Sequence, residues 1–322
     1  MGQVNTVTRQ SSKIDLIIEE IEKVVLGKRE VIEMILVALL AGGHVLIEDV
    51  PGVGKTTLAN ALAKATGLKS RRAQFTPDVM ASDITGFTMY NKETNSFEYR
   101  QGLVMCNILL ADEINRTSPK TQSALLEAME EGNVTVDGVR HELPSPFMVI
   151  ATQNQQGFVG TFPLPEAQLD RFLMKITIGY PDLMEEINLI AQRRESNPIK
   201  SIISIFDKNE IALLKNDVKQ MHIEANTYKF IVELVRMTRE HKDIELGASP
   251  RASLALMRSA QAYAYINKRD YVIPEDVAKM FPYIVSHRLM LSQEAKIRRQ
   301  SIANVIEEIR EIVSVPYLGR KR

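Results

Sequence analysis

The sequence predicts an α/β domain followed by a helical domain, and three observations support this fold class. An apolar run over residues 44–48 is followed by a Pro- and Gly-containing turn and then by a helix. A second apolar run, over residues 107–111, ends in the carboxylates Asp112 and Glu113. After Tyr180 the apolar residues recur at helical spacing. Continuous apolar runs are typical of buried parallel strands, so we expect such a sheet in the first part of the chain.

Length and composition fit a globular protein of two domains. The chain has 322 residues, which suggests two domains. Because the α/β pattern ends at Tyr180-Pro181, we expect an α/β core over residues 1–180 and a helical domain over residues 181–322. Hydrophobic residues make up 45% and charged residues 25%, both ordinary values. Lys and Arg number 40, as do Asp and Glu. This balance argues against a dedicated nucleic-acid-binding protein, which would carry a strong basic excess.

Two helices are expected before the first strand, over residues 13–25 and 30–41, because isoleucines and leucines recur there at helical spacing. The second of them could also form a wall of an adenine pocket. A further helix should follow the turn at residues 49–57 and stop at Gly67.

The turn itself has the composition of a phosphate-binding loop. Its glycines let backbone N–H groups approach phosphate oxygens, and the following helix N-terminus adds partial positive charge. Lys55 can reach the β- and γ-phosphates, and the Thr56 hydroxyl can bind Mg²⁺. Asp49 stands where the motif usually has its first glycine. The loop residues expected to hold the nucleotide are Asp49, Pro51, Gly52, Val53, Gly54, Lys55, Thr56 and Thr57.

The middle of the core should contain two inserted hairpins. One is expected to pair residues 87–90 with 97–100. The other surrounds Asp137-Gly138, a pair that suits a type I′ turn. Between them, a helix should begin at Ser118-Pro119 and end at Gly132.

Polar residues follow two expected strands at the edge where ligands bind in open α/β sheets. Asp112 would complete the Mg²⁺ shell, and Glu113 would polarise the attacking water. Asn154 follows the strand expected over residues 147–152 and could orient that water and sense the γ-phosphate. Alone, either set could belong to an ordinary solvated turn.

Two arginines are candidates for phosphate contacts. Arg171 lies between a helix expected to begin at residue 164 and a strand expected over residues 172–178, and could contact phosphate at a subunit boundary. The alternative is a surface pair with Asp170. Arg251 opens a helix in the second domain, where it could reach phosphate or simply be exposed.

The sequence gives little indication of a disulfide, a bound structural metal or a targeting segment. Cys106 is the only cysteine, so no intrachain disulfide can form, and its setting favours a buried residue over a reactive thiol. The five histidines show no metal-ligand spacing. There is no signal segment or membrane-length apolar run, so a cytoplasmic location is expected.

As an ordered set these motifs resemble the AAA+ ATPases, and within them the MoxR family. The resemblance implies an α/β core with a five-stranded parallel sheet between helices, two hairpin inserts and a C-terminal all-α lid. It also implies a ring, usually a hexamer, with ATP and Mg²⁺ between neighbouring subunits. The residues that carry it are 48–56, 75–78, 82–86, 110–116, 117–131, 151–154 and 164–172.

The resemblance also assigns roles to single residues. Asp112 and Glu113 match the Walker B pair, and Asn154 matches the first sensor. Arg251 matches the second sensor, acting on its own or on a neighbour's nucleotide. Arg171 and Arg116 are both candidates for an arginine acting on a neighbour, with Arg171 preferred.

Family members act as chaperone-like motors that mature or activate protein complexes, often with a partner that carries a von Willebrand factor A domain. The same function is therefore expected for this chain, on an unknown client. Two alternatives from related clades are a nucleic-acid motor and the ATPase subunit of a metal chelatase.

Overall fold

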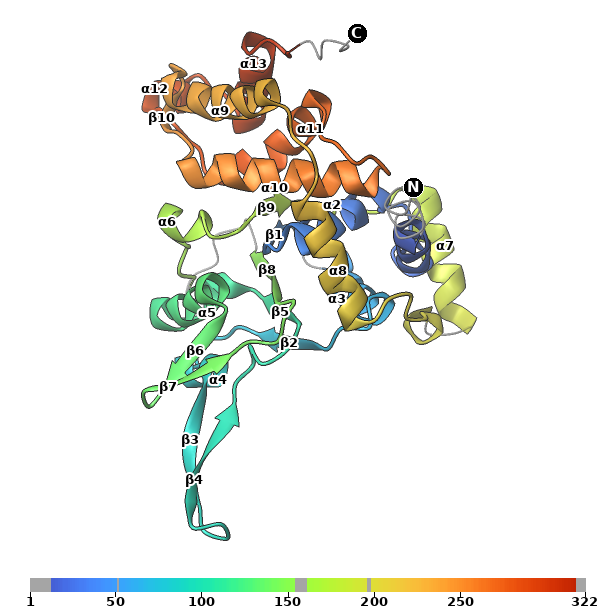
Figure 1. Ribbon diagram of the computed structural model, residues 1–322, viewed down its shortest axis with the longest axis vertical. Helices are drawn as coiled ribbons and strands as arrows, with labels where there is room; N and C mark the ends of the chain where they lie inside the picture. Colours follow the sequence, from blue (N-terminus) through green and yellow to red (C-terminus); the bar gives the residue numbers. More distant parts are fainter. Residues whose placement is uncertain (1–12, 51, 154–160, 196–197, 317–322) are drawn as a thin grey trace.

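The computed structural model describes residues 13–50, 52–153, 161–195 and 198–316. Figure 1 shows a sheet-containing core with a group of helices, in orange and red, packed against one side of it. Residues 13–22 are helical. The other core elements are α2 (Arg29–Ala41), β1 (Val45–Glu48), α3 (Lys55–Ala65), β2 (Ser70–Gln74), α4 (Ala81–Thr85), β3 (Gly86–Asn91), β4 (Ser96–Gln101), β5 (Ile108–Asp112), the 3₁₀ helix η1 (Ile114–Arg116), α5 (Pro119–Glu131), β6 (Asn133–Val136), β7 (Val139–Glu142), β8 (Met148–Gln153), α6 (Glu166–Leu169) and β9 (Met174–Ile176).

The second part of the chain is mainly helical. A long helix, α7, follows the core and leads into a bundle in which α10 is the longest member. The elements are α7 (Leu183–Glu195), the 3₁₀ helix η2 (Pro198–Ser201), α8 (Lys208–Lys219), α9 (Ala225–Glu240), β10 (Ile244–Leu246), α10 (Pro250–Ile266), α11 (Pro274–Val285), β11 (Met290–Leu291), α12 (Gln293–Ile297) and α13 (Ile302–Ile312).

The central sheet has five strands in the order β2-β5-β8-β1-β9, and every pairing is parallel. This confirms the predicted fold class. Strand β5 is buried along its whole length, as is β8 up to its last residue. Both faces of these strands are covered, which explains why their sequences are continuous apolar runs rather than alternating ones.

The apolar residues of the sheet divide between two clusters because successive side chains point to opposite faces. Leu109 and Ala111 of β5 join one cluster, with Leu125 of α5. Ile108 and Leu110 join the other cluster, which contains α2 and α3 and continues without a break into the helices of the second part. The sheet is therefore packed on both faces, and one of its two cores is shared with the helical part.

Both predicted hairpins are present. Strands β3 and β4 pair antiparallel, as do β6 and β7 around the turn at Asp137 and Gly138. The β3–β4 hairpin extends away from the body of the molecule (Figure 1). Helix α5 also begins and ends as predicted, with Ser118 as its N-cap and Gly132 in a left-handed conformation at its end.

The second part differs from the predicted all-α domain in one respect. Strands β10 and β11 form a two-stranded antiparallel ribbon. They are only three and two residues long, too short for an alternating pattern to stand out from the surrounding helical spacing. The boundary at residue 180 stays a prediction.

Cys106 is buried, and burial raises its pKa to about 11. The structure thus confirms a small buried residue rather than a reactive thiol. Among the helices in the described part of the chain, none is long and apolar enough to cross a membrane.

Candidate active site

The loop between β1 and α3 has the backbone that a phosphate-binding loop needs. Gly52 and Gly54 adopt φ angles of +89° and +92°, which residues with a Cβ rarely adopt. Both lie in open space on the side where a Cβ would project. Helix α3 then begins at Lys55, with Thr56 and Thr57 partly exposed in its first turn. Pro51 lies outside the described residues.

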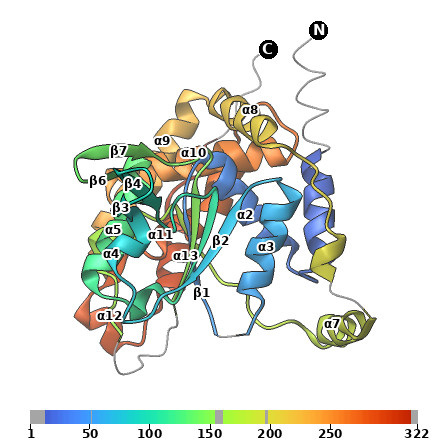
Figure 2. The same ribbon diagram turned by 90° about the horizontal axis from the view of Figure 1, so that it is seen from below.

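A cavity of about 280 Å³ adjoins this loop. Its walls include Gly54 of the loop, Val25 and Leu26 from the turn after the first helical segment, Tyr180 from the segment before α7, and Leu189 of α7. In Figure 2 the loop and α7 lie on the same, lower side of the molecule. The residues that line this cavity include the turn before α2 and none of residues 30–41, and the predicted adenine wall from that helix stays a prediction.

The side chain of Lys55 is held by a backbone carbonyl of the loop. Its Nζ donates a hydrogen bond to the carbonyl oxygen of Asp49 at 2.9 Å. Burial lowers its pKa, while the charges of Asp49, Asp112 and Glu113 act in the opposite direction. The predicted lysine and carboxylates therefore lie close enough to interact electrostatically, which the spacing of their motifs could not establish.

The structure explains why an aspartate, Asp49, stands at the position where the motif usually has glycine. Its carboxylate accepts hydrogen bonds from the backbone N–H groups of Val50, Ile178 and Gly179, at 2.8, 2.7 and 2.7 Å. The bonds from Ile178 and Gly179 join the loop to the segment that follows β9. They also end β9 at Ile176, before the predicted residue 178, because the Ile178 N–H bonds to a side chain instead of a strand. The Asp49 carboxylate thus supports the loop.

Asp112 is the last residue of β5 and projects from the sheet edge next to the loop. Its Oδ2 accepts a hydrogen bond from Arg72 Nε at 2.7 Å, and its Oδ1 accepts one from Thr152 Oγ1 at 3.4 Å. Arg72 and Thr152 come from the two strands that flank β5. The partners follow from strand order, so the sequence alone could not identify them.

Glu113 adopts an unusual backbone conformation. Its φ angle is +57°, which costs a residue with a side chain on the order of 1 kcal/mol. Its N–H donates to Thr152 Oγ1 at 2.9 Å. Its carboxylate accepts hydrogen bonds from Arg116 at 2.7 Å and from Gln74 at 3.0 Å. The side chain is therefore held by residues of η1 and β2, and the backbone N–H by a residue of β8.

The candidate sensor Asn154 lies outside the described residues. Gln153, the residue before it, ends β8 and donates to Glu48 at the end of β1. Arg116, one of the two candidates for contact with a neighbour, lies beside Glu113 in the same chain.

The other two arginines lie at the opposite end of the sheet. Arg171 Nε lies 3.2 Å from Glu130 Oε2, and Arg251 donates to Glu130 Oε1 at 2.7 Å. They line a cavity of about 330 Å³ together with Gly43 and His44, which precede β1, whereas the phosphate loop follows β1. The four residues of β1 span roughly 13 Å. Within one chain, the two arginines and the loop thus belong to different sites.

The predicted alternative for Arg171 was a pair with Asp170, and the structure shows different partners for both residues. Asp170 accepts a hydrogen bond from Arg288 Nε at 2.7 Å, and Arg171 pairs with Glu130. Helix α6 also ends at Leu169 and β9 begins only at Met174, so Arg171 lies in a short connection. Sequence reasoning missed Glu130 and Arg288 because their partners lie far away in the chain.

Comparisons with known proteins agree with the fold and the loop. Residues 44–174 match the family described as "ATPase family associated with various cellular activities (AAA)", and residues 236–309 match the "AAA lid domain". The uncharacterized protein YeaC of Bacillus subtilis is 51% identical over 299 residues, which are 93% of each chain.

Two further relatives cover nearly the whole chain. The chaperone MoxR1 of Mycobacterium tuberculosis is 39% identical over 93% of this chain and 81% of its own. A solved structure from Cytophaga hutchinsonii, of a protein classed as an ATPase, superposes with a TM-score of 0.91 at 39% identity and covers 97% of this chain and 98% of its own. With its phosphate loop, its acidic pair and its helical lid, the chain belongs to the MoxR family of AAA+ ATPases.

Proposed function

We propose that ATP is bound and hydrolysed between two copies of this chain. The observation that carries the proposal is the separation described above. The loop with Asp112 and Glu113 lies at the carboxyl ends of the strands, and Arg171 with Arg251 lies at the amino ends. Two copies placed end to end bring the arginines of one to the loop of the other. Arg251 would then act on a neighbour's nucleotide.

In this arrangement the loop residues 49–57 hold the phosphates. Backbone N–H groups freed by the positive φ angles of Gly52 and Gly54 face the phosphate oxygens, and Lys55 exchanges its contact with the Asp49 carbonyl for a phosphate oxygen. The apolar cavity beside the loop, with Val25 and Leu26, suits the adenine base.

Glu113 is the proposed base that orients and polarises the attacking water. Gln74 and Arg116 hold its carboxylate, so the group is already directed before the nucleotide arrives. Asn154 is expected to orient the same water. Arg171, supplied by the neighbour, stabilises the charge that develops on the transferred phosphoryl group.

The donor groups also fit Mg²⁺. The Thr56 hydroxyl and the Asp112 carboxylate are hard oxygen ligands, and Mg²⁺ usually takes one or two such protein groups together with phosphates and water. No cluster of three or more metal-binding side chains occurs in the described residues. When bound, Mg²⁺ would neutralise phosphate charge. Asp112 would have to release Arg72 in part to coordinate it.

We further propose that this hydrolysis drives remodelling of a protein complex in the cytoplasm. The active assembly is a ring of six subunits, the usual size in the family, and it works with a partner that carries a von Willebrand factor A domain. The name of the relative MoxR1 as a chaperone supports the remodelling role. The equal numbers of acidic and basic residues argue against a nucleic-acid motor.

The test is the rate of phosphate release per chain, measured with Mg²⁺ and ATP across protein concentrations, with the mass of the assembly measured in parallel. We expect the rate per chain to rise with the fraction of chains that are assembled. A lone chain would lack a neighbour's Arg171 and Arg251 at its loop. A rate per chain independent of assembly would contradict a shared site. Affinity capture with Glu113→Gln under ATP would then identify the client and the partner.

A further inference from the structure

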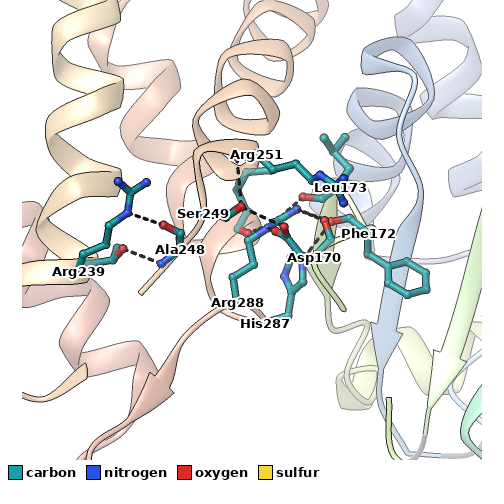
Figure 3. Close-up of polar contacts among 11 residues, drawn as sticks. Asp170, Phe172, Leu173, Arg239, Ala248, Ser249, Arg251, His287 and Arg288 are labelled. Carbon is teal, nitrogen blue, oxygen red and sulfur yellow. Dashed lines mark hydrogen bonds and ion pairs between the residues drawn. The ribbon is translucent and has the colours of Figure 1, made fainter. Parts of the chain in front are cut away.

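The connection that carries Arg171 is bound by the lid through one buried arginine. Arg288 follows α11 in the second part of the chain and is 7% exposed. It donates to the Asp170 carboxylate at 2.7 Å and to the carbonyl oxygens of Asp170 at 3.2 Å, Phe172 at 2.5 Å and Leu173 at 3.1 Å. The carbonyls on both sides of Arg171 thus share one guanidinium (Figure 3).

Two other lid residues complete this attachment. Ser249 Oγ donates to the second oxygen of the Asp170 carboxylate at 3.0 Å and accepts from the Arg251 N–H at 3.2 Å, as the N-cap of α10. The ring of His287 lies 3.1 Å from the Phe172 carbonyl oxygen, and because a carbonyl only accepts, its Nε2 must donate. Figure 3 shows these lid side chains converging on Asp170, Phe172 and Leu173.

We propose that Arg288 is a positioning residue that fixes Arg171 to the lid, so that the arginine offered to a neighbouring subunit moves with the lid of its own subunit. The planar guanidinium can satisfy several carbonyl oxygens and a carboxylate at once, which a lysine ammonium cannot do in the same geometry. The four-residue helix α6 and the three-residue strand β9 give the connection little support of their own. This inference rests on the proposed function, in which Arg171 acts on a neighbour.

The test uses full-length Arg288→Gln, with ATP affinity, KM and kcat measured separately. We expect ATP affinity and KM within about twofold of wild type, because the phosphate loop is untouched, and a kcat lower by roughly 10- to 1,000-fold. Arg288→Lys should recover only part of the loss. An unchanged kcat would overturn the proposal.

Mixed assemblies distinguish a misplaced Arg171 from a damaged subunit. Arg288→Gln subunits keep their own phosphate loop, so Lys55→Ala subunits, which keep Arg171 in place, should restore hydrolysis when mixed with them. Arg171→Ala subunits should not. Mixing Arg171→Ala with Lys55→Ala tests the underlying shared site. If that pair recovers activity and the Arg288→Gln pair does not, the positioning role is wrong and the proposed function stands; if neither recovers, the proposed function fails.

Two more variants control for the fold. Arg269 pairs with Asp276 inside the lid and contacts none of residues 170–173 in the described structure, so Arg269→Gln removes a comparable ion pair elsewhere. We expect it to keep kcat within about twofold of wild type. An equal fall in kcat would show that lid damage alone explains the effect of Arg288→Gln.

If Arg288→Gln does not assemble, Asp170→Asn tests the proposal instead, because it weakens the same contact while preserving the size of the side chain. It should show a smaller fall in kcat with the same mixing pattern, and a normal kcat would overturn the proposal.

Discussion

The two ends of the central sheet hold different kinds of chemistry. At the carboxyl ends, a glycine-containing loop and two carboxylates surround Lys55. At the amino ends, Arg171 and Arg251 share the carboxylate of Glu130. Among the described residues, Arg171 and Arg251 lie at the end away from Lys55, Asp112 and Glu113. Under the proposed shared site, the unit of catalysis is a contact between two copies, and we expect a phosphate to replace Glu130 as the partner of the two arginines.

The ends also differ in how they are held. The loop end is fixed within the core, through the bonds of Asp49 to the segment after β9. The arginine end is fixed by the lid, through Arg288 and Ser249. The proposals above therefore predict that a change in lid position acts first on the groups offered to a neighbour.

The largest expected effect is at the loop end. Lys55→Ala should lose ATP binding and all measurable hydrolysis, because the lysine is the cation at the phosphates. Binding of a fluorescent ATP analogue measures this directly. Normal affinity in this variant would remove the loop from the site.

At the other end, Arg171→Ala should lower kcat by roughly 1,000-fold while ATP binding and assembly persist. The reason is that its own subunit's loop remains intact. Steady-state hydrolysis together with mass measurement checks the prediction. Retained turnover would exclude Arg171 as the arginine acting on a neighbour and leave Arg116 as the candidate.

Glu113→Gln should bind ATP normally and hydrolyse it roughly 100-fold more slowly, since the amide keeps the hydrogen-bonding geometry and loses the base. A single-turnover assay separates binding from the chemical step. Full turnover in this variant would show that another group activates the water.

A smaller effect concerns stability and belongs to the arginine end. His44 is buried there, with its Nδ1 accepting from the Val149 N–H at 2.9 Å and its Nε2 3.1 Å from the Met129 carbonyl. Burial lowers its pKa from 6.5 to about 4. The unfolded chain therefore binds a proton first as the pH falls, and stability is lost between about pH 6.5 and 4. The loss should reach roughly 2 kcal/mol by pH 5.

The control for this effect is His44→Gln, whose amide can accept and donate in the same places. Its unfolding free energy, measured by denaturant titration at pH 7 and pH 5, should fall by roughly 2 kcal/mol less than that of wild type. An equal fall in both proteins would assign the pH dependence to other groups. His287, whose pKa is also lowered by burial, contributes to the remaining slope.

Much of the fold could be predicted from local patterns. The apolar runs of β5 and β8, the Asp-Gly turn and the Ser-Pro helix start each depend on neighbouring residues, and each was confirmed. The ribbon of β10 and β11 and the early end of β9 were missed. Their causes are a pairing across 44 residues, from Leu246 to Met290, and a side chain that takes a strand's hydrogen bond.

The site shows the same division. The loop and the acidic pair are contiguous in sequence, so their chemistry could be inferred from motifs. The partners that set their geometry, Arg72 for Asp112 and Arg288 for Asp170, lie 40 and 118 residues away. Such pairs depend on strand order and on how the lid packs, which no local pattern encodes.

The most direct test of the shared site is to mix equal amounts of Lys55→Ala and Arg171→Ala subunits, each inactive alone, and to measure phosphate release. If each site takes its loop from one copy and its arginine from the next, random mixing makes roughly one contact in four complete. Activity should therefore return to roughly a quarter of the wild-type rate. No recovery, in mixtures shown to contain both subunits, would contradict the account.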